Sequence, residues 1–143
     1  MNNLVVSIEV TVNPTEDLAK VKKAAENIFG TLEFKAKPGT GGHIFLSQNK
    51  GYETLIRFQD LINREQIIAA ARKIFRGGMT DNSVNFFLNK QVAYAGHISF
   101  SQQTAESPLG PITVQINCDN PRKLIDWLAP RPPSKTRKKI SRK

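Results

Sequence analysis

The sequence predicts an α+β fold with two layers, in which a mostly antiparallel or mixed sheet carries its helices on one face. Apolar and polar residues alternate over residues 4–12, which is the period of a strand with one buried face. Several later segments instead repeat their apolar residues at helical spacing. Strands also follow one another in the second half of the chain, which favours α+β over a doubly wound parallel fold.

The first strand is expected to lead into a helix. Asn13-Pro14 interrupts regular structure after residues 4–12, and residues 15–17 offer capping side chains and negative charge for a helix N-terminus. A helix is therefore expected from there to Phe29, and Gly30 ends it.

The middle of the chain is expected to contain a short strand, a loop and a second helix. Residues 31–36 resemble a short strand, and residues 37–42 are expected to form a loop because three of the six are glycines. Regular structure then resumes at residues 43–46. The spacing of apolar residues favours a helix over residues 52–62, although a strand around Leu55 also fits the pattern.

A capping signal precedes the next helix. Asn63 is followed three residues later by Gln66, which resembles a capping box. The predicted helix has one apolar stripe and is closed by Gly77-Gly78. The stripe consists of Ile67, Ala71, Ile74 and Phe75.

A β-hairpin is predicted in the second half of the chain. Residues 84–88 and 92–100 both resemble strands, and the segment 89–91 between them has the length of a hairpin turn. Residues 107–111 break the pattern, and residues 112–116 alternate as a further strand.

A final helix is expected after Asp119-Asn120-Pro121, which repeats the punctuation found before the first helix. This helix places Leu124, Ile125 and Leu128 on the body of the protein. If the helices cover one face of the sheet, the opposite face is polar and poor in aromatic and basic residues. The residues expected there are Ser7, Glu9, Thr11, His97, Ser99, Thr113, Gln115 and Asn117.

Charge is concentrated at the C-terminal end, which divides the chain into one domain over residues 1–130 and a basic, proline-containing tail over residues 131–143 that is expected to be disordered. The tail holds seven of the 21 basic residues and none of the 12 acidic ones, so the formal net charge of +9 falls to +2 without it. This cluster favours a nucleic acid as partner, because basic side chains neutralise phosphates. Its members are Arg131, Lys135, Arg137, Lys138, Lys139, Arg142 and Lys143.

The location expected for the protein is the cytoplasm. Cys118 is the only cysteine, which excludes an intrachain disulfide and suits a reducing interior. No signal-like N-terminus is present, and no apolar run approaches the ~20 residues that span a bilayer, so no membrane association is expected.

No catalytic motif, cofactor site or metal site is recognisable, so an enzyme is not expected. The loop at residues 37–42 lacks the Lys and the Ser or Thr that follow the last glycine of a phosphate-binding Walker A loop. Neither histidine has a companion ligand at metal-binding spacing. An enzyme remains an alternative only if four dispersed residues converge in one pocket, namely His43, His97, Cys118 and Asp126.

Two features of the body bear on nucleic-acid binding. Arg72 and Arg76 lie four residues apart on the polar side of their helix with Lys73 beside them, so they either extend the positive field of the tail or form a solvated helix face. Trp127 can stack on an unpaired base, but core packing is the favoured interpretation.

Three segments together resemble a family of small archaeal proteins, uncharacterised protein family two hundred and one. They are Phe87-Leu88-Asn89-Lys90-Gln91-Val92-Ala93-Tyr94, Ser107-Pro108-Leu109-Gly110-Pro111-Ile112, and Asp119-Asn120-Pro121 with Ile125-Asp126-Trp127-Leu128-Ala129-Pro130. The resemblance implies an α+β fold like that of the ribosomal protein that binds five-S RNA, and an RNA-binding role. It implies no enzyme activity and no site residues.

The leading hypothesis is therefore a non-catalytic RNA-binding protein, in which the tail contacts phosphates and Arg72, Lys73 and Arg76 assist. The alternative is a homodimeric protein-interaction module, in which the open sheet face or an edge strand meets a second copy and the basic tail serves solubility.

Overall fold

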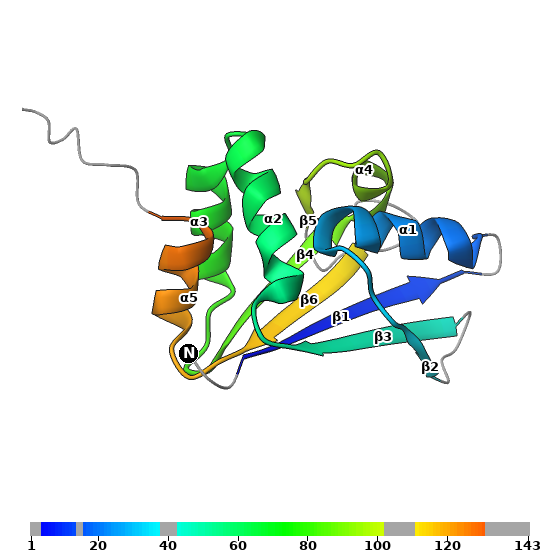
Figure 1. Ribbon diagram of the computed structural model, residues 1–143, viewed down its shortest axis with the longest axis horizontal. Coiled ribbons are helices and arrows are strands. Elements are labelled where there is room, and N and C mark those ends of the chain that lie inside the picture. The colour runs from blue at the N-terminus through cyan, green and yellow to red at the C-terminus, as the bar shows by residue number, and fades with distance from the viewer. Residues whose placement is uncertain (1–3, 14–15, 38–42, 102–110, 131–143) are drawn as a thin grey trace, which may run out of the picture.

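The computed structural model describes residues 4–13, 16–37, 43–101 and 111–130, which form six strands and five helices (Figure 1). The strands are β1 (Val5–Val12), β2 (Lys35–Lys37), β3 (His43–Lys50), β4 (Ser83–Asn89), β5 (Phe100–Ser101) and β6 (Pro111–Asn117). The helices are α1 (Leu18–Phe29), α2 (Glu53–Arg64), α3 (Ile68–Gly77), α4 (Lys90–Tyr94) and α5 (Pro121–Leu128).

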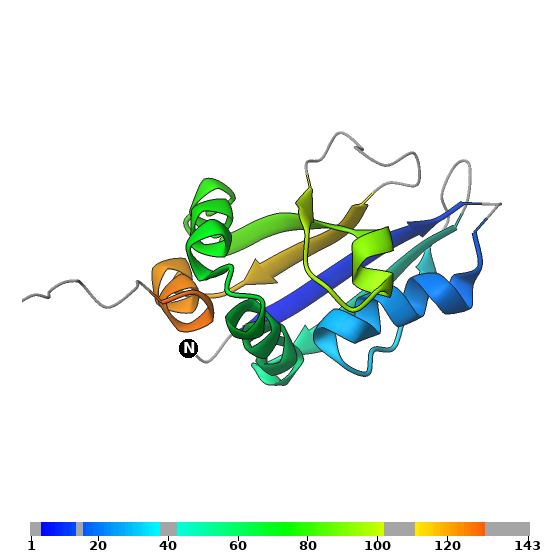
Figure 2. The same cartoon turned by 90° about the horizontal axis from the view of Figure 1, so that it is seen from above.

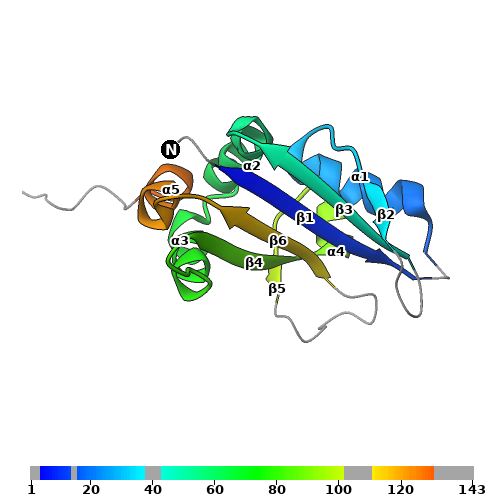
Figure 3. The ribbon, with the colours of Figure 1, turned by 90° about the horizontal axis from the view of Figure 1, so that it is seen from below.

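The strands form one sheet in the order β2-β3-β1-β6-β4-β5, and every neighbouring pair is antiparallel. All five helices lie on the same side of this sheet, as the views from above and below show (Figures 2 and 3). The prediction of a two-layer α+β fold with helices on one face is confirmed.

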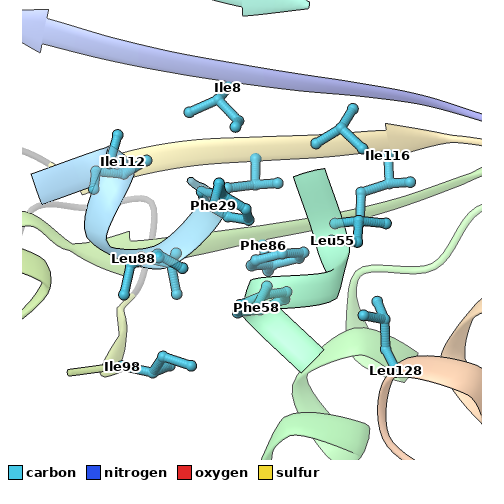
Figure 4. Packing of buried hydrophobic residues seen from close by; sticks show 14 of the residues in the cluster. Ile8, Phe29, Leu55, Phe58, Phe86, Leu88, Ile98, Ile112, Ile116 and Leu128 are labelled. Atoms are coloured by element: carbon cyan, nitrogen blue, oxygen red, sulfur yellow. The ribbon is translucent and has the colours of Figure 1, made fainter. Parts of the chain in front are cut away.

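The sheet buries one face because its strands alternate apolar and polar residues. In β1, Val6, Ile8, Val10 and Val12 are buried while the residues between them are partly exposed. The aromatic rings of the helices pack onto the same face of β4: Phe58 of α2 stacks on Phe86 with ring centroids 5.4 Å apart (Figure 4). This alternation dictates which face the helices cover.

Local signals at the first and last helices act as the sequence predicts. The Asp17 side chain accepts a hydrogen bond from the Ala19 backbone N–H at 2.9 Å, and Gly30 ends α1 with a φ of 85°. The Asn120 side chain accepts from the Lys123 N–H at 3.2 Å, directly before Pro121 in the first turn of α5. A helix is also confirmed at α2, which excludes a strand around Leu55.

The predicted capping box between α2 and α3 is wrong. Asn63 lies inside α2, and Gln66 adopts a φ of 56° in the short connection between the two helices. The helix α3 itself is confirmed, but it begins after Ile67 without a side-chain cap. One member of its predicted stripe, Ile74, points outward and is 39% exposed.

The predicted short strand over residues 31–36 is displaced. The regular strand β2 begins only at Lys35. Before it, Leu32 is fully buried and its backbone N–H donates to the Glu26 carboxylate at 2.9 Å. This contact holds the residues after α1 against that helix instead of in the sheet.

The predicted hairpin turn at residues 89–91 is also wrong, because the chain forms helix α4 there. Asn89 ends β4 and caps α4, its side chain accepting from the Val92 N–H at 3.0 Å. The partner that β4 meets along its length is β6, and β5 adds only a two-residue pairing through Leu88 and Phe100.

A buried ion pair fixes α4 to the first strand. Lys90 is 4% exposed, and its ammonium group donates to the Thr11 carbonyl at 2.7 Å and to the Glu16 carboxylate at 3.0 Å. Glu16 also accepts from the Asn13 backbone N–H at 2.9 Å. The end of β1, the entry to α1 and the start of α4 therefore meet at one charged contact.

Replacing Lys90 alone should be strongly destabilising. Lys90→Met leaves the Glu16 carboxylate buried without its cation, and we expect a loss of about 3–5 kcal/mol in the free energy of unfolding. The double variant Lys90→Met/Glu16→Leu should lose less than the sum of the two single variants, because no uncompensated charge remains. Urea unfolding of the four proteins measures this coupling, and strict additivity would contradict the contact.

Candidate nucleic-acid interface

Helices α3 and α5 lie side by side at one end of the helical layer (Figures 1 and 3). Arg72 of α3 joins them: its guanidinium donates to the Ala129 carbonyl at 3.0 Å and forms an ion pair with Asp126 at 2.8 Å. The Arg72 side chain is only 15% exposed. Arg72 therefore holds the C-terminal end of α5 in place, and its charge is largely used inside the protein.

A pocket of about 430 Å³ opens beside this contact. Arg76, Arg122 and Pro130 line it together with Arg72. A second hollow, which shares Arg72 and Arg76 with the first, is lined by Lys73 as well. We call Lys73, Arg76 and Arg122 the α3/α5 basic surface.

The α3/α5 basic surface is positive because its acid is already paired. Of the described residues that line the two hollows, only Asp126 is acidic, and it binds Arg72. Within the described part of the chain, Lys73, Arg76 and Arg122 have no acidic partner within 4.0 Å. Two basic side chains elsewhere do have acidic partners: Arg64 binds Asp60 and Lys90 binds Glu16.

The predicted site residues thus have different outcomes. Lys73 and Arg76 are exposed on the α3/α5 basic surface, whereas Arg72 is a packing residue. Sequence reasoning missed Arg122, although a basic residue directly after the Pro121 that starts a helix marks an exposed first turn. The tail residues Arg131, Lys135, Arg137, Lys138, Lys139, Arg142 and Lys143 lie outside the described residues, and so the division at residue 130 stays a prediction.

The structure does not bring the four dispersed candidates for catalysis together. His43 pairs with Val12 at one end of β1, and Cys118 directly follows Asn117, which pairs with Val5 at the other end. Seven residues of strand, roughly 23 Å, separate these two ends. The alternative of an enzyme built from these residues is therefore contradicted.

The other members of that set are used in local contacts. His97 Nδ1 lies 3.2 Å from the Glu65 carboxylate, and Asp126 is paired with Arg72. Burial raises the pKa of the Cys118 thiol, which disfavours the reactive thiolate. Among the described residues, no three His, Cys, Asp or Glu side chains gather as a metal site would require. The loop considered for phosphate binding falls mostly in residues 38–42, outside the described ranges.

Trp127 packs against the core, which confirms core packing as its role. Its ring meets Tyr52 edge-on with centroids 4.8 Å apart, and its backbone carbonyl accepts from the Gln59 side chain at 2.6 Å. The ring is therefore committed to the junction of α2 and α5.

The sheet face opposite the helices is visible in Figure 3. The polar residues predicted there from β1 and β6 are on that face, but His97 and Ser99 are not, because they precede β5 in a connection outside the strands. The cross-strand register also places Lys35 and Phe87 in one row with Glu9 and Thr113. The face thus carries an aromatic and a basic residue that sequence reasoning missed.

The helices described here are short. The longest, α1 and α2, have 12 residues each. No helix in the described ranges combines the length and the apolar character that a membrane crossing requires.

This chain is similar in sequence to a described protein family and to several archaeal proteins. A family model described as RNA binding matches residues 5–118, which include all of the sheet and the first four helices, so the chain belongs to the class of proteins that this model describes. The UPF0201 protein of Pyrobaculum islandicum is 42% identical over 123 residues, which cover 85% of this chain and 86% of that protein. The UPF0201 protein of Pyrococcus abyssi is 40% identical over 126 residues, covering 88% and 89%.

A solved structure agrees with these relatives. The crystal structure of the UPF0201 protein from Methanococcus jannaschii superimposes with a TM-score of 0.77 at 34% identity, covering 88% of this chain and 99% of that one. The chain belongs to the UPF0201 family, which confirms the resemblance seen in the sequence. The implied likeness to the ribosomal five-S RNA-binding protein stays a prediction.

The structural role of Arg72 can be separated from a binding role. Arg72→Ala removes a charged hydrogen-bond donor from the Ala129 carbonyl, and we expect the free energy of unfolding to fall by about 1.5–3 kcal/mol. Lys73→Ala, one residue along the same helix but exposed, should change it by less than about 0.5 kcal/mol. Urea unfolding gives both values, and equal stability of the two variants would show that the Arg72 contacts are dispensable.

Proposed function

We propose that this protein is a non-catalytic RNA-binding protein whose α3/α5 basic surface contacts RNA phosphates. The observation that supports this most is the unpaired positive charge around one pocket. Arg72 neutralises Asp126 there, which leaves Arg76 and Arg122 without an acidic partner among the described residues. Unpaired guanidinium groups around a hollow suit phosphate, which they bind with two parallel hydrogen bonds.

The position of Pro130 joins this surface to the tail. Pro130 lines the pocket and is the last described residue, and the basic Arg131 follows it directly in the sequence. Residues 131–143 hold seven basic residues, with Arg131 the first of them. We therefore expect the body to supply fixed positive charges and the tail to supply additional ones.

RNA is preferred over other polyanions because the matching family model is described as RNA binding. Phosphate contacts by themselves position a protein on nucleic acid without reading its sequence. The α3/α5 basic surface consequently accounts for affinity, and sequence or structure preference requires a separate contact.

The alternative, a homodimeric protein-interaction module, has less in its favour. The comparisons lend it no support, and the strands at the two edges of the sheet are short: β2 has three residues and β5 has two. Short edge strands are a common means by which proteins prevent pairing with a second sheet.

The α3/α5 basic surface is tested by removing its two arginines. Arg76→Ala/Arg122→Ala should weaken RNA binding and reduce the slope of log affinity against log salt by about 1.4 for single-stranded RNA, since each phosphate contact contributes about 0.7. Lys22→Ala/Lys23→Ala is the matched control, because it removes the same charge from the exposed side of α1. An equal loss of slope in both variants would show that only net charge matters.

The tail is tested by deleting residues 131–143. If all seven basic residues contact phosphates of single-stranded RNA, the salt slope should fall by at most about five, and the protein should keep its urea unfolding midpoint. Fluorescence anisotropy with a labelled RNA at several salt concentrations measures the slope. An unchanged affinity and slope after the deletion would refute any role of the tail in binding.

A further inference from the structure

Helices α1 and α4 lie at the opposite end of the helical layer from α5 (Figures 1 and 2). A further pocket, of about 340 Å³, is lined by residues of α1 and α4 and by the two residues before α1. Its floor is apolar and buried, being formed by Val21 and Ala24 of α1. The side chains of Lys20, Gln91 and Tyr94 line it above this floor. Its volume falls in the range of roughly 300–1,000 Å³ that is typical of pockets for small ligands.

Tyr94 is an exposed aromatic residue on a fixed backbone. Tyr94 is 44% exposed and is not part of the hydrophobic core. The Asn27 side chain of α1 donates to the carbonyls of Ala93 and Tyr94 at 3.1 and 3.0 Å, which ties the end of α4 to α1. The ring is thus presented to solvent from a position that the fold holds in place.

The charges that line the pocket balance one another. Glu16 is paired with Lys90 in the buried contact described above, and the Asp17 carboxylate accepts from the Ala19 backbone N–H as the cap of α1. The lining thus holds two acidic residues, Glu16 and Asp17, and two basic residues, Lys20 and Lys90. A neutral pocket with an apolar floor suits an uncharged ring better than a phosphate group.

Polar groups for recognition remain available at the rim. The side-chain amide of Gln91, the hydroxyl of Tyr94 and the ammonium group of Lys20 have no hydrogen-bond or ion-pair partner among the described residues. An amide can donate and accept on the edge of a base, and a tyrosine ring can stack on its face.

We propose that this pocket binds one unpaired nucleobase of an RNA strand. Tyr94 stacks on the base, Gln91 contacts its edge, and Lys20 contacts the neighbouring phosphate. The choice of ligand rests on the proposed RNA-binding function, and the pocket supplies the base contact that the α3/α5 basic surface lacks. The proposal gives a role to the exposed end of α4 at Tyr94, which the ion pair of Lys90 does not explain.

The test compares single variants in the full-length protein. Tyr94→Ala should weaken binding of a short single-stranded RNA by roughly 5- to 150-fold, the range found for loss of one stacked base, while leaving the salt slope unchanged. Tyr94→Phe should retain most of the affinity because stacking does not need the hydroxyl. Ile56→Ala, which removes an even more exposed apolar residue on α2, is the control and should bind as the wild type does.

A second measurement separates this pocket from the α3/α5 basic surface. In NMR titrations of the four ribonucleoside monophosphates, the amide signals of Val21, Ala24 and Gln91 should shift, and Tyr94→Ala should abolish the shifts while Arg76→Ala/Arg122→Ala should not. Wild-type RNA affinity in Tyr94→Ala, or nucleotide shifts that avoid these residues, would overturn the base pocket. The proposed phosphate surface is overturned by a different result: an unchanged slope of log affinity against log salt in Arg76→Ala/Arg122→Ala.

Discussion

The structure depends on one constraint: each long strand of the sheet has a single apolar face, and all of these faces point the same way. β1 carries this constraint most directly, because it lies between β3 and β6 and buries every second residue from Val6 to Val12. All helices must then share one side of the sheet. Helices consequently contact one another within that layer, and two of these junctions carry the proposed surfaces: α3 meets α5, and α1 meets α4.

Different electrostatics distinguish these two junctions. At the α3/α5 end, one acid is neutralised by Arg72 and the surrounding cations stay unpaired, which leaves a surface suited to phosphate. At the α1/α4 end, Lys90 and Glu16 neutralise each other in the lining of a pocket that also contains apolar residues and an exposed tyrosine, which is the surface proposed to bind a base. The two proposals therefore assign affinity and selectivity for RNA to separate junctions of one helical layer.

Elements with local signals could be predicted from the sequence. The strand at β1 follows from alternation, and the ends of α1 and α5 follow from Asp17, Gly30 and Asn120, whose effects act within a few residues. The hairpin prediction failed because residues 92–100 also alternate, whereas the outcome was decided by a cap at Asn89 and by the contact of Lys90 with Glu16, 74 residues away. No local pattern reveals such a contact.

The same limit applies to the sites. Lys73 and Arg76 were identified from their exposed helical positions, but the sequence does not show that Arg72 turns toward Ala129 and Asp126. The proposed base pocket was missed because alternation predicts a strand that includes Tyr94. The sequence therefore does not show that Tyr94 lies beside α1. Charge could be read from the sequence, whereas its pairing required the tertiary structure.

The most direct test of the phosphate surface is lysine footprinting of the unmodified protein with and without saturating RNA. Acetylation rates of individual lysines, read by mass spectrometry, report which side chains the RNA covers. Lys73 should react more slowly in the complex, while Lys22 and Lys23 on the exposed side of α1 should react at unchanged rates. Full reactivity of Lys73 in saturating RNA would contradict the assignment of the α3/α5 basic surface.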